Sequence, residues 1–123
     1  LNLTQSMVLE AYFEGLVLGL KEGLAIDKIM EVFDNAGPRN NAALAAMPNV
    51  LARNFEPHFL LELMNKDMKL AKEELEKLHL ELPLARTVIN VFQEAVDKNL
   101  GKENWSAIVK LLEEKAGVAV KDK

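Results

Sequence analysis

The stretch FLLELMNKDMKLAKEELEKL, residues 59–78, has the pattern of a single amphipathic helix. Its apolar residues recur close to the 3.6-residue helical period, at Phe59, Leu60, Leu63, Met64, Leu70, Ala71, Leu75 and Leu78. Lys66 lies three residues after Leu63, and Asp67 lies three residues after Met64. Both charges therefore fall on or beside the face that we expect to be buried.

Two interpretations of this charged pair are open. In the structural one, the Lys66 side chain runs along apolar surface to reach solvent, and Asp67 bonds the end of a neighbouring helix. In the functional one, the pair lies at the edge of a cleft and serves a ligand there. The residues alone favour the structural interpretation, because long charged side chains often lie along apolar surface.

The rest of the chain predicts further helices and no strand, with short loops and no repeat. We expect six helical segments, at residues 3–22, 26–37, 39–55, 59–78, 83–101 and 103–117. The first is apolar nearly all round, which is typical of a central, covered helix. Pro48 should kink or break the third segment, and Gly101 should stop the fifth. The predicted fold is an all-α domain of about six packed helices over residues 1–117, with a frayed tail at 118–123.

Small residues recur every fourth position along the first segment, at Ala11, Gly15, Gly19 and Gly23. Glycine inside a helix costs about 1 kcal/mol relative to alanine. The stripe therefore predicts that another backbone approaches closely there, unless these glycines are merely tolerated. Gly23 should end the helix.

Composition excludes several classes of function. A net charge of −4 and the lack of a basic run give no general attraction for nucleic acid or anionic membranes. The chain has no cysteine and only two histidines, His58 and His79, with no metal-binding spacing, so we expect no metal site. We expect His58 to cap a helix or lie on the surface and His79 to be exposed. No apolar run approaches the length of a membrane span, and the default expectation is a soluble cytoplasmic protein.

The chain also lacks the motifs of a self-contained enzyme. It has no GxGxxG or GxxxxGK[ST] phosphate-binding loop and no paired nucleophile and base. It opens with LNLTQSM, without an initiator methionine and with the helical pattern already running. We therefore expect a piece of a longer polypeptide; the alternative is a trimmed small protein. Polar residues beside apolar faces, Asn2, Ser6 and Glu14 among them, are the remaining candidates for chemistry.

The run FLLELMNKDMKLAKEEL resembles the signature helix of the β-hydroxyacid dehydrogenases, which include 3-hydroxyisobutyrate dehydrogenase, tartronate semialdehyde reductase and, more distantly, 6-phosphogluconate dehydrogenase. The family pattern has a phenylalanine, a lysine–aspartate pair seven residues later and then an apolar pair. These are Phe59, Lys66–Asp67 and Leu70–Ala71 here. The stretches FEGLVLGLKEGLAIDKIMEVFDNAG and LPLARTVINVFQEAVDKNLGKENWSAIVKLLEE are similar to the segments that precede and follow this helix in the family.

The resemblance implies a two-part protein, of which this chain is the helical C-terminal part with a fold like that of the 6-phosphogluconate dehydrogenase C-terminal domain. The N-terminal Rossmann domain, which binds NAD or NADP, is absent from this chain. The family's catalytic Lys-x-x-x-Asn places its asparagine at Asn2, so the lysine acid/base would precede Leu1. The family often has Asn-Asn at this point, whereas this sequence reads LNLT.

Under this resemblance, Asn2 belongs to the catalytic group, and Lys66, Asp67 and Phe59 contribute to binding substrate or cofactor. The implied function is oxidation or reduction of a small β-hydroxy acid, with the helical domain closing the active site and assembling a homodimer or homotetramer. The isolated chain would be inactive. Two alternatives stay open: a non-catalytic helical dimerisation module, and a relative of the imine reductases with altered catalytic positions.

Overall fold

The computed structural model describes residues 1–123 and contains six α-helices and one 3-10 helix, with no strand. The elements are α1 (Asn2–Lys21), α2 (Ile26–Asn35), α3 (Asn41–Leu51), α4 (Leu61–Lys77), α5 (Pro83–Asp97), η1 (Trp105–Ile108) and α6 (Val109–Ala116). The predicted all-α class with six helices is confirmed. Only an isolated bridge between Leu60 and Asn104 has β geometry.

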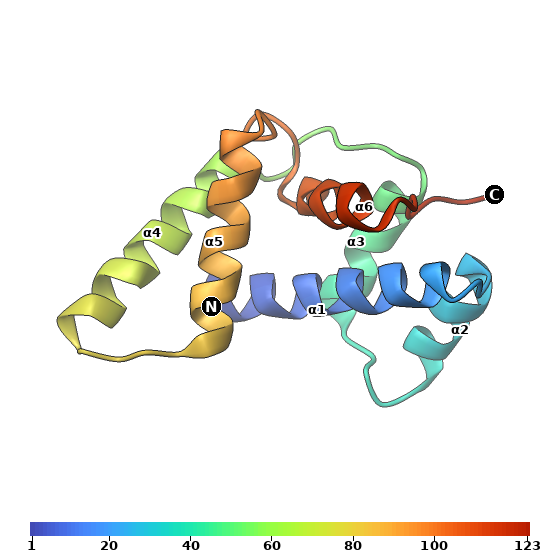
Figure 1. The fold of residues 1–123 in the computed structure, drawn as a ribbon, viewed down its shortest axis with the longest axis horizontal. Coiled ribbons are helices and arrows are strands. Elements are labelled where there is room, and N and C mark those ends of the chain that lie inside the picture. The colour runs from blue at the N-terminus through green and yellow to red at the C-terminus, as the bar shows by residue number, and fades with distance from the viewer.

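Helix α1 forms the centre of the fold. It packs against α2, α3, α4, α5 and α6, and Figure 1 shows it running through the molecule from the α4–α5 hairpin at one end to α2 at the other. Its apolar side chains on several faces account for this position, because each face meets a different helix. Leu9, Phe13 and Leu16 are completely buried. The predicted central first helix is therefore confirmed.

Helices α4 and α5 form an antiparallel hairpin at one end of the molecule, where α5 crosses the start of α1 (Figure 1). The buried side of α4 carries Leu61, Met64, Asn65 and Met68. The helix begins at Leu61, two residues later than predicted, because the preceding segment is extended and bonds the loop after α5. There the backbone N–H groups of Leu61 and Glu62 donate to the carbonyls of Glu103 and Gly101, at 2.9 and 3.0 Å.

The expected break at Pro48 and the expected stop at Gly101 are both wrong. Helix α3 continues through Pro48 to Leu51, which leaves a kink as the remaining part of the expectation there. The residues Met47 and Val50 beside the proline are buried, and burial of both side chains offsets the hydrogen bond that proline cannot make. Helix α5 ends at Asp97 rather than at Gly101, because Asn99 adopts a left-handed conformation with φ 65°.

The glycine stripe of α1 faces side chains of α2 rather than another backbone. A Cβ atom at Gly15 would lie 3.0 Å from the ring of Phe33, and one at Gly19 would lie 2.7 Å from Cδ1 of Ile29. The expected close approach therefore exists, but its partners are side chains. Gly23, with φ 90°, follows the end of α1 as predicted.

The C-terminal tail, expected to fray, packs onto the body of the protein. The side chain of Val120 is completely buried. Its backbone N–H donates to Oε2 of Glu113 at 2.6 Å, and Arg53 donates two hydrogen bonds to the same carboxylate, at 2.7 and 3.0 Å. The polar sequence of residues 121–123 gives no sign of this packing, because Arg53 and Leu51, which also bond the tail, lie far away in the chain.

A carboxyl group lies buried on α1. Glu10 is 6% exposed, and its Oε2 atom has no hydrogen-bond partner. Burial raises the pKa of Glu10 from 4.5 to about 7; the negative charges of Glu14 and Glu94 add to this rise, and Lys115 opposes it. Glu10 is thus largely protonated below neutral pH.

We predict that Val120→Ala destabilises the protein by about 2 kcal/mol, because it removes two buried methyl groups at the tail contact. Urea unfolding followed by circular dichroism measures this. Val32→Ala is the matched control: Val32 is 57% exposed, so its change should stay within about 0.5 kcal/mol. Equal effects of the two substitutions would contradict the docked tail.

We also predict that stability falls as pH rises from about 4.5 to about 7 and then levels off. In this interval the folded protein binds the Glu10 proton and the unfolded chain does not, so the fall amounts to about 3 kcal/mol. Unfolding free energies at pH 5 and pH 8 measure it.

Glu10→Gln should abolish most of this pH dependence, whereas Glu22→Gln, at an exposed position beyond the end of α1, should retain it. The same difference between pH 5 and pH 8 in the wild type and in Glu10→Gln would contradict the buried neutral carboxyl.

Candidate functional site

A hydrogen bond joins two of the predicted site residues, which lie 65 positions apart in the chain. Nδ2 of Asn2, in the first turn of α1, donates to Oδ2 of Asp67, in the middle of α4, at 2.7 Å. Both side chains are half-buried. Because a carboxylate only accepts hydrogen bonds, this contact fixes the amide orientation of Asn2 and leaves its Oδ1 as an acceptor.

A shallow groove opens beside this pair. It is lined by the first residues of α1 and one side of α4: Leu1, Asn2, Leu3, Asp67, Leu70 and Ala71. The walls are mostly apolar, and the polar atoms come from Asn2 and Asp67. The groove can therefore hold an apolar group next to a fixed donor and acceptor pair.

Lys66 projects on the outer side of α4. Its side chain is exposed, and Asp67 bonds Asn2 rather than its neighbour Lys66. Leu63 and Leu70, one turn on either side of Lys66, are 44% and 52% exposed. Part of the face that we expected to be buried is therefore exposed to solvent, because the buried side of α4 is the one that carries Leu61, Met64, Asn65 and Met68. We call Leu63, Lys66 and Leu70 the outward stripe.

Phe59 precedes α4 and lies in the extended segment that leads into the helix. Its backbone N–H and that of His58 both donate to Oδ1 of Asn104, at 3.1 Å each, and its carbonyl accepts from the N–H of Trp105 at 2.9 Å. The ring is 37% exposed. Phe59 lies seven residues before Lys66 in the chain, outside α4, whereas Lys66 lies within the helix.

Asn104, which the sequence analysis did not single out, anchors this segment. It is 6% exposed, and its Nδ2 donates to Oγ of Ser106 at 2.8 Å. With its Oδ1 serving two backbone N–H groups, it positions Phe59. An asparagine before an apolar run is an ordinary helix-start signal, and its contact with residues 45 positions earlier leaves no local trace.

The histidines lie outside the Asn2–Asp67 contact. Both side chains are exposed, as expected for His79 and for a surface His58. His79 has φ 54° in the turn after α4. No three side chains of the metal-binding types come together in the chain.

Polar side chains continue along α1 from Asn2 at four-residue intervals, at Ser6, Glu10 and Glu14. Each step turns the side chain by about 40° around the helix. Asn2 therefore faces α4, whereas Glu10 has turned towards α5 and α6. Ser6 is fully buried, and its Oγ has no hydrogen-bond partner. The four-residue spacing from Asn2 could have drawn attention to Glu10 in the sequence. A glutamate within an apolar helix is usually solvated, however, so its burial was not expected.

No helix of the protein has both the length and the apolar character needed to cross a membrane.

Comparison with known proteins identifies the family. The family model described as "NAD-binding of NADP-dependent 3-hydroxyisobutyrate dehydrogenase" matches residues 1–112. L-threonate dehydrogenase of Escherichia coli K12 is 31% identical over 98 residues, which are 80% of this chain and 32% of that protein. The 2-(hydroxymethyl)glutarate dehydrogenase of Eubacterium barkeri is 30% identical over 120 residues, 97% of this chain and 40% of that protein.

Solved structures share the fold. A 3-hydroxyisobutyrate dehydrogenase from Salmonella typhimurium superposes with a TM-score of 0.83 at 26% identity, over 89% of this chain and 39% of that one. Psf3 in complex with NADP+ superposes with a TM-score of 0.80 at 21% identity, over 90% of this chain and 39% of that one, and supports the fold alone.

The chain thus spans about a third to two-fifths of the length of the relatives it matches. The family model covers nearly the whole chain, including Asn2, Phe59, Lys66 and Asp67. The chain therefore belongs to the family described as "NAD-binding of NADP-dependent 3-hydroxyisobutyrate dehydrogenase".

Proposed function

We propose that this chain is the helical C-terminal part of an NAD(P)-dependent oxidoreductase that acts on a small β-hydroxy acid. The observation that carries the proposal is the Asn2–Asp67 hydrogen bond with Lys66 beside it, in a chain of this family. The preceding Rossmann part would bind most of the cofactor, and the present residues would close the site. In this proposal, residues 1–117 form a domain that binds substrate and mediates oligomerisation.

The reaction needs an acid/base for the hydroxyl proton and a polar environment for the substrate carboxylate. When it is bound, the nicotinamide group of NAD or NADP would supply the hydride acceptor or donor. Under the family resemblance, the acid/base that exchanges this hydroxyl proton is a lysine four residues before Asn2, one helical turn away. The free Oδ1 of Asn2 then accepts a hydrogen bond from that lysine or from the substrate hydroxyl.

Asp67 supports this arrangement in two ways. Its 2.7 Å hydrogen bond holds the Asn2 amide in one orientation. Its carboxylate also places negative charge close to the start of α1, where it favours the protonated form of a nearby lysine. The lysine would then be ready to donate a proton to a carbonyl substrate or to receive one back from a hydroxy acid.

The residues of α4 fit an anionic ligand with an apolar part. Lys66 offers an exposed cation with no carboxylate bonded to it in this chain, between the apolar side chains of Leu63 and Leu70. Phe59 offers a partly exposed ring in the extended segment that leads into α4. We assign Lys66 to a carboxylate or phosphate of substrate or cofactor, and Phe59 to the apolar lining near the nicotinamide.

Self-association is a further part of the proposal, and so is a cytoplasmic location. Four leucines at the tip of the α4–α5 hairpin, Leu78, Leu80, Leu82 and Leu84, are 47–72% exposed. Apolar surface of this kind favours contact with another chain. The same observation is the one that supports the alternative, a non-catalytic dimerisation module.

We predict that Lys66→Ala in the full-length enzyme lowers kcat/KM by about 100-fold, a loss of about 2.7 kcal/mol in transition-state stabilisation. A charge-assisted contact to the ligand accounts for a loss of this size. The melting temperature should not change, because Lys66 is exposed.

Steady-state kinetics with β-hydroxy acids and NAD or NADP measure this effect. Lys69→Ala, at an exposed position one turn further along α4, is the matched control and should leave kcat/KM within a factor of about two. Equal kinetics for the two variants would refute the assignment of Lys66. A wild-type enzyme without any NAD(P)-dependent activity on these acids would instead favour the dimerisation module.

A further inference from the structure

The extended segment before α4 is held by the part of the chain that follows α5. The backbone N–H of Asn104 donates to the carbonyl of Phe55 at 2.9 Å. The backbone N–H of Trp105 donates to the carbonyl of Phe59 at 2.9 Å. Oδ1 of Asn104 also accepts from the N–H groups of His58 and Phe59, at 3.1 Å each. Both the N–H and the carbonyl of Phe59 are therefore fixed by residues 104 and 105.

Only one orientation of the Asn104 amide fits these contacts. Asn104 is 6% exposed, and its Nδ2 donates to Oγ of Ser106 at 2.8 Å. The reverse orientation would direct the NH2 group at two N–H donors and leave them without an acceptor. No backbone carbonyl accepts from the N–H of His58 or Phe59. The Oδ1 atom of Asn104 therefore sets the direction of the Phe59 backbone on its N–H side.

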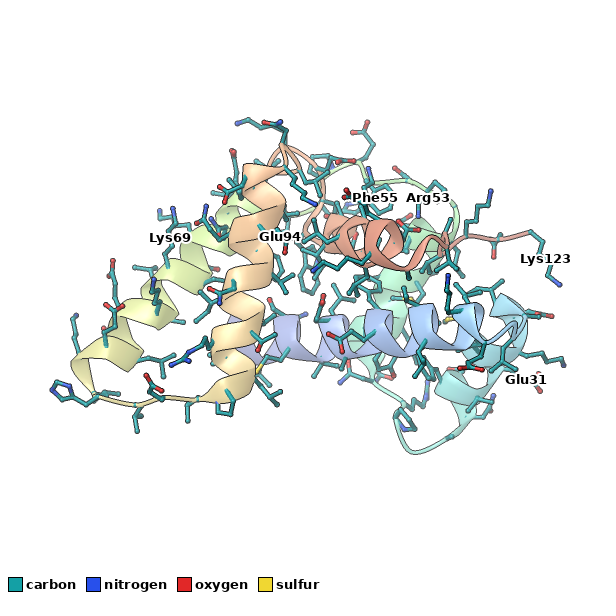
Figure 2. All side chains as sticks on the ribbon, in the orientation of Figure 1. Glu31, Arg53, Phe55, Lys69, Glu94 and Lys123 are labelled. Atoms are coloured by element: carbon teal, nitrogen blue, oxygen red, sulfur yellow. The ribbon has the colours of Figure 1, made fainter.

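The two phenylalanines of this segment have opposite surroundings. Phe55 is 9% exposed, and its ring centre lies 5.0 Å from the guanidinium carbon of Arg53 and 4.4 Å from Nζ of Lys110. Figure 2 shows Phe55 beside Arg53 near α6. The ring of Phe59 is 37% exposed and lies outside the hydrophobic core. Three hydrogen bonds thus fix the backbone of a residue whose ring adds nothing to the core.

A fixed backbone beneath an exposed aromatic ring favours binding of a ligand. The ordering cost is met when the chain folds, so it does not reduce the affinity when a ligand arrives. An aromatic ring also offers a large, stiff apolar face for a planar group. The hydrogen bonds around Phe59 therefore have a use in binding that the packing of this chain does not explain.

We propose that Asn104 is a positioning residue of the oxidoreductase, which holds the Phe59 ring where the ring contacts the nicotinamide or the substrate. This inference rests on the proposed function, which assigns Phe59 to the apolar lining near the nicotinamide. Asn104 is buried and does not touch the ligand. Its whole effect on the reaction therefore passes through Phe59.

Replacement of Asn104 by alanine frees two N–H groups. His58 and Phe59 are both exposed, so these groups would turn towards water and the Phe59 backbone would turn with them. A displacement of about 1 Å at a reacting site can cost about 100-fold in rate. We expect Asn104→Ala to lower kcat/KM by about 10-fold or more. Asn104→Asp keeps an acceptor for both N–H groups and for the Ser106 hydroxyl, so it should stay within a factor of about three of the wild type.

A double-mutant cycle in the full-length enzyme tests the proposal, with NADP+ and the β-hydroxy acid that the wild type oxidises fastest. The variants are Asn104→Ala, Phe59→Ala and the combination of the two. Because Asn104 acts through Phe59, the combined variant should match Phe59→Ala within a factor of about two. If Asn104→Ala does not fold, Asn104→Ser takes its place, since the shorter hydroxyl serves at most one of the two N–H groups.

Asn54→Ala is the matched control. Asn54 is an exposed asparagine of the same loop, and its Oδ1 accepts from the N–H of Glu56 at 3.1 Å. This contact does not involve Phe59, so the control should leave kcat/KM within a factor of about two.

Three results would overturn the inference in an active enzyme. These are wild-type kcat/KM in Asn104→Ala, the same loss in the presence and absence of the Phe59 ring, and a loss in Asn104→Asp as large as in Asn104→Ala. A purely structural Asn104 gives the second result, because its effect does not depend on the ring. A wild type without NAD(P)-dependent activity would instead overturn the proposed function and this inference with it, so the two failures are distinguishable.

Discussion

The burial of α1 is the constraint on which the rest of the structure depends. A helix that packs against five other helices cannot rotate or slide without breaking all of these contacts. The polar side chains of α1 therefore lie at fixed positions against the neighbouring helices. Asn2 meets α4, where Asp67 fixes its amide, and Glu10 meets α5 and α6, where its carboxyl stays neutral below about pH 7.

The helical class follows from the apolar periodicity of the sequence, and so does the central position of the first helix. The details that differ depend on contacts between distant residues. The tail packs because the side chain of Val120 is buried in the core and its backbone N–H bonds Glu113. Helix α3 continues through Pro48 because the nearby side chains of Met47 and Val50 are buried. Likewise, α5 ends at Asp97 because Asn99 adopts a left-handed conformation, although Gly101 is the stronger local signal.

The four candidate site residues were named from the sequence, and the structure brings two of them, Asn2 and Asp67, into contact. The apolar pattern around Lys66 and Asp67 predicted that both lie at one face, yet α4 places Asp67 against Asn2 and Lys66 outwards. The role of Asn2 came from family resemblance, since nothing local marks that asparagine. Asn104 and Glu10 were missed because their importance lies in burial, which depends on packing by other helices.

The proposal that Lys66 contacts substrate or cofactor implies that bound cofactor, and the part of the full-length protein proposed to bind it, cover this lysine of the outward stripe. Acetylation rates of Lys66 and Lys69 in the full-length protein, followed by mass spectrometry with and without NADP+, test it most directly. Both lysines are exposed in this chain. The account predicts that Lys66 reacts more slowly than Lys69 and that NADP+ slows it further. Equal rates for the two lysines in both conditions would contradict it.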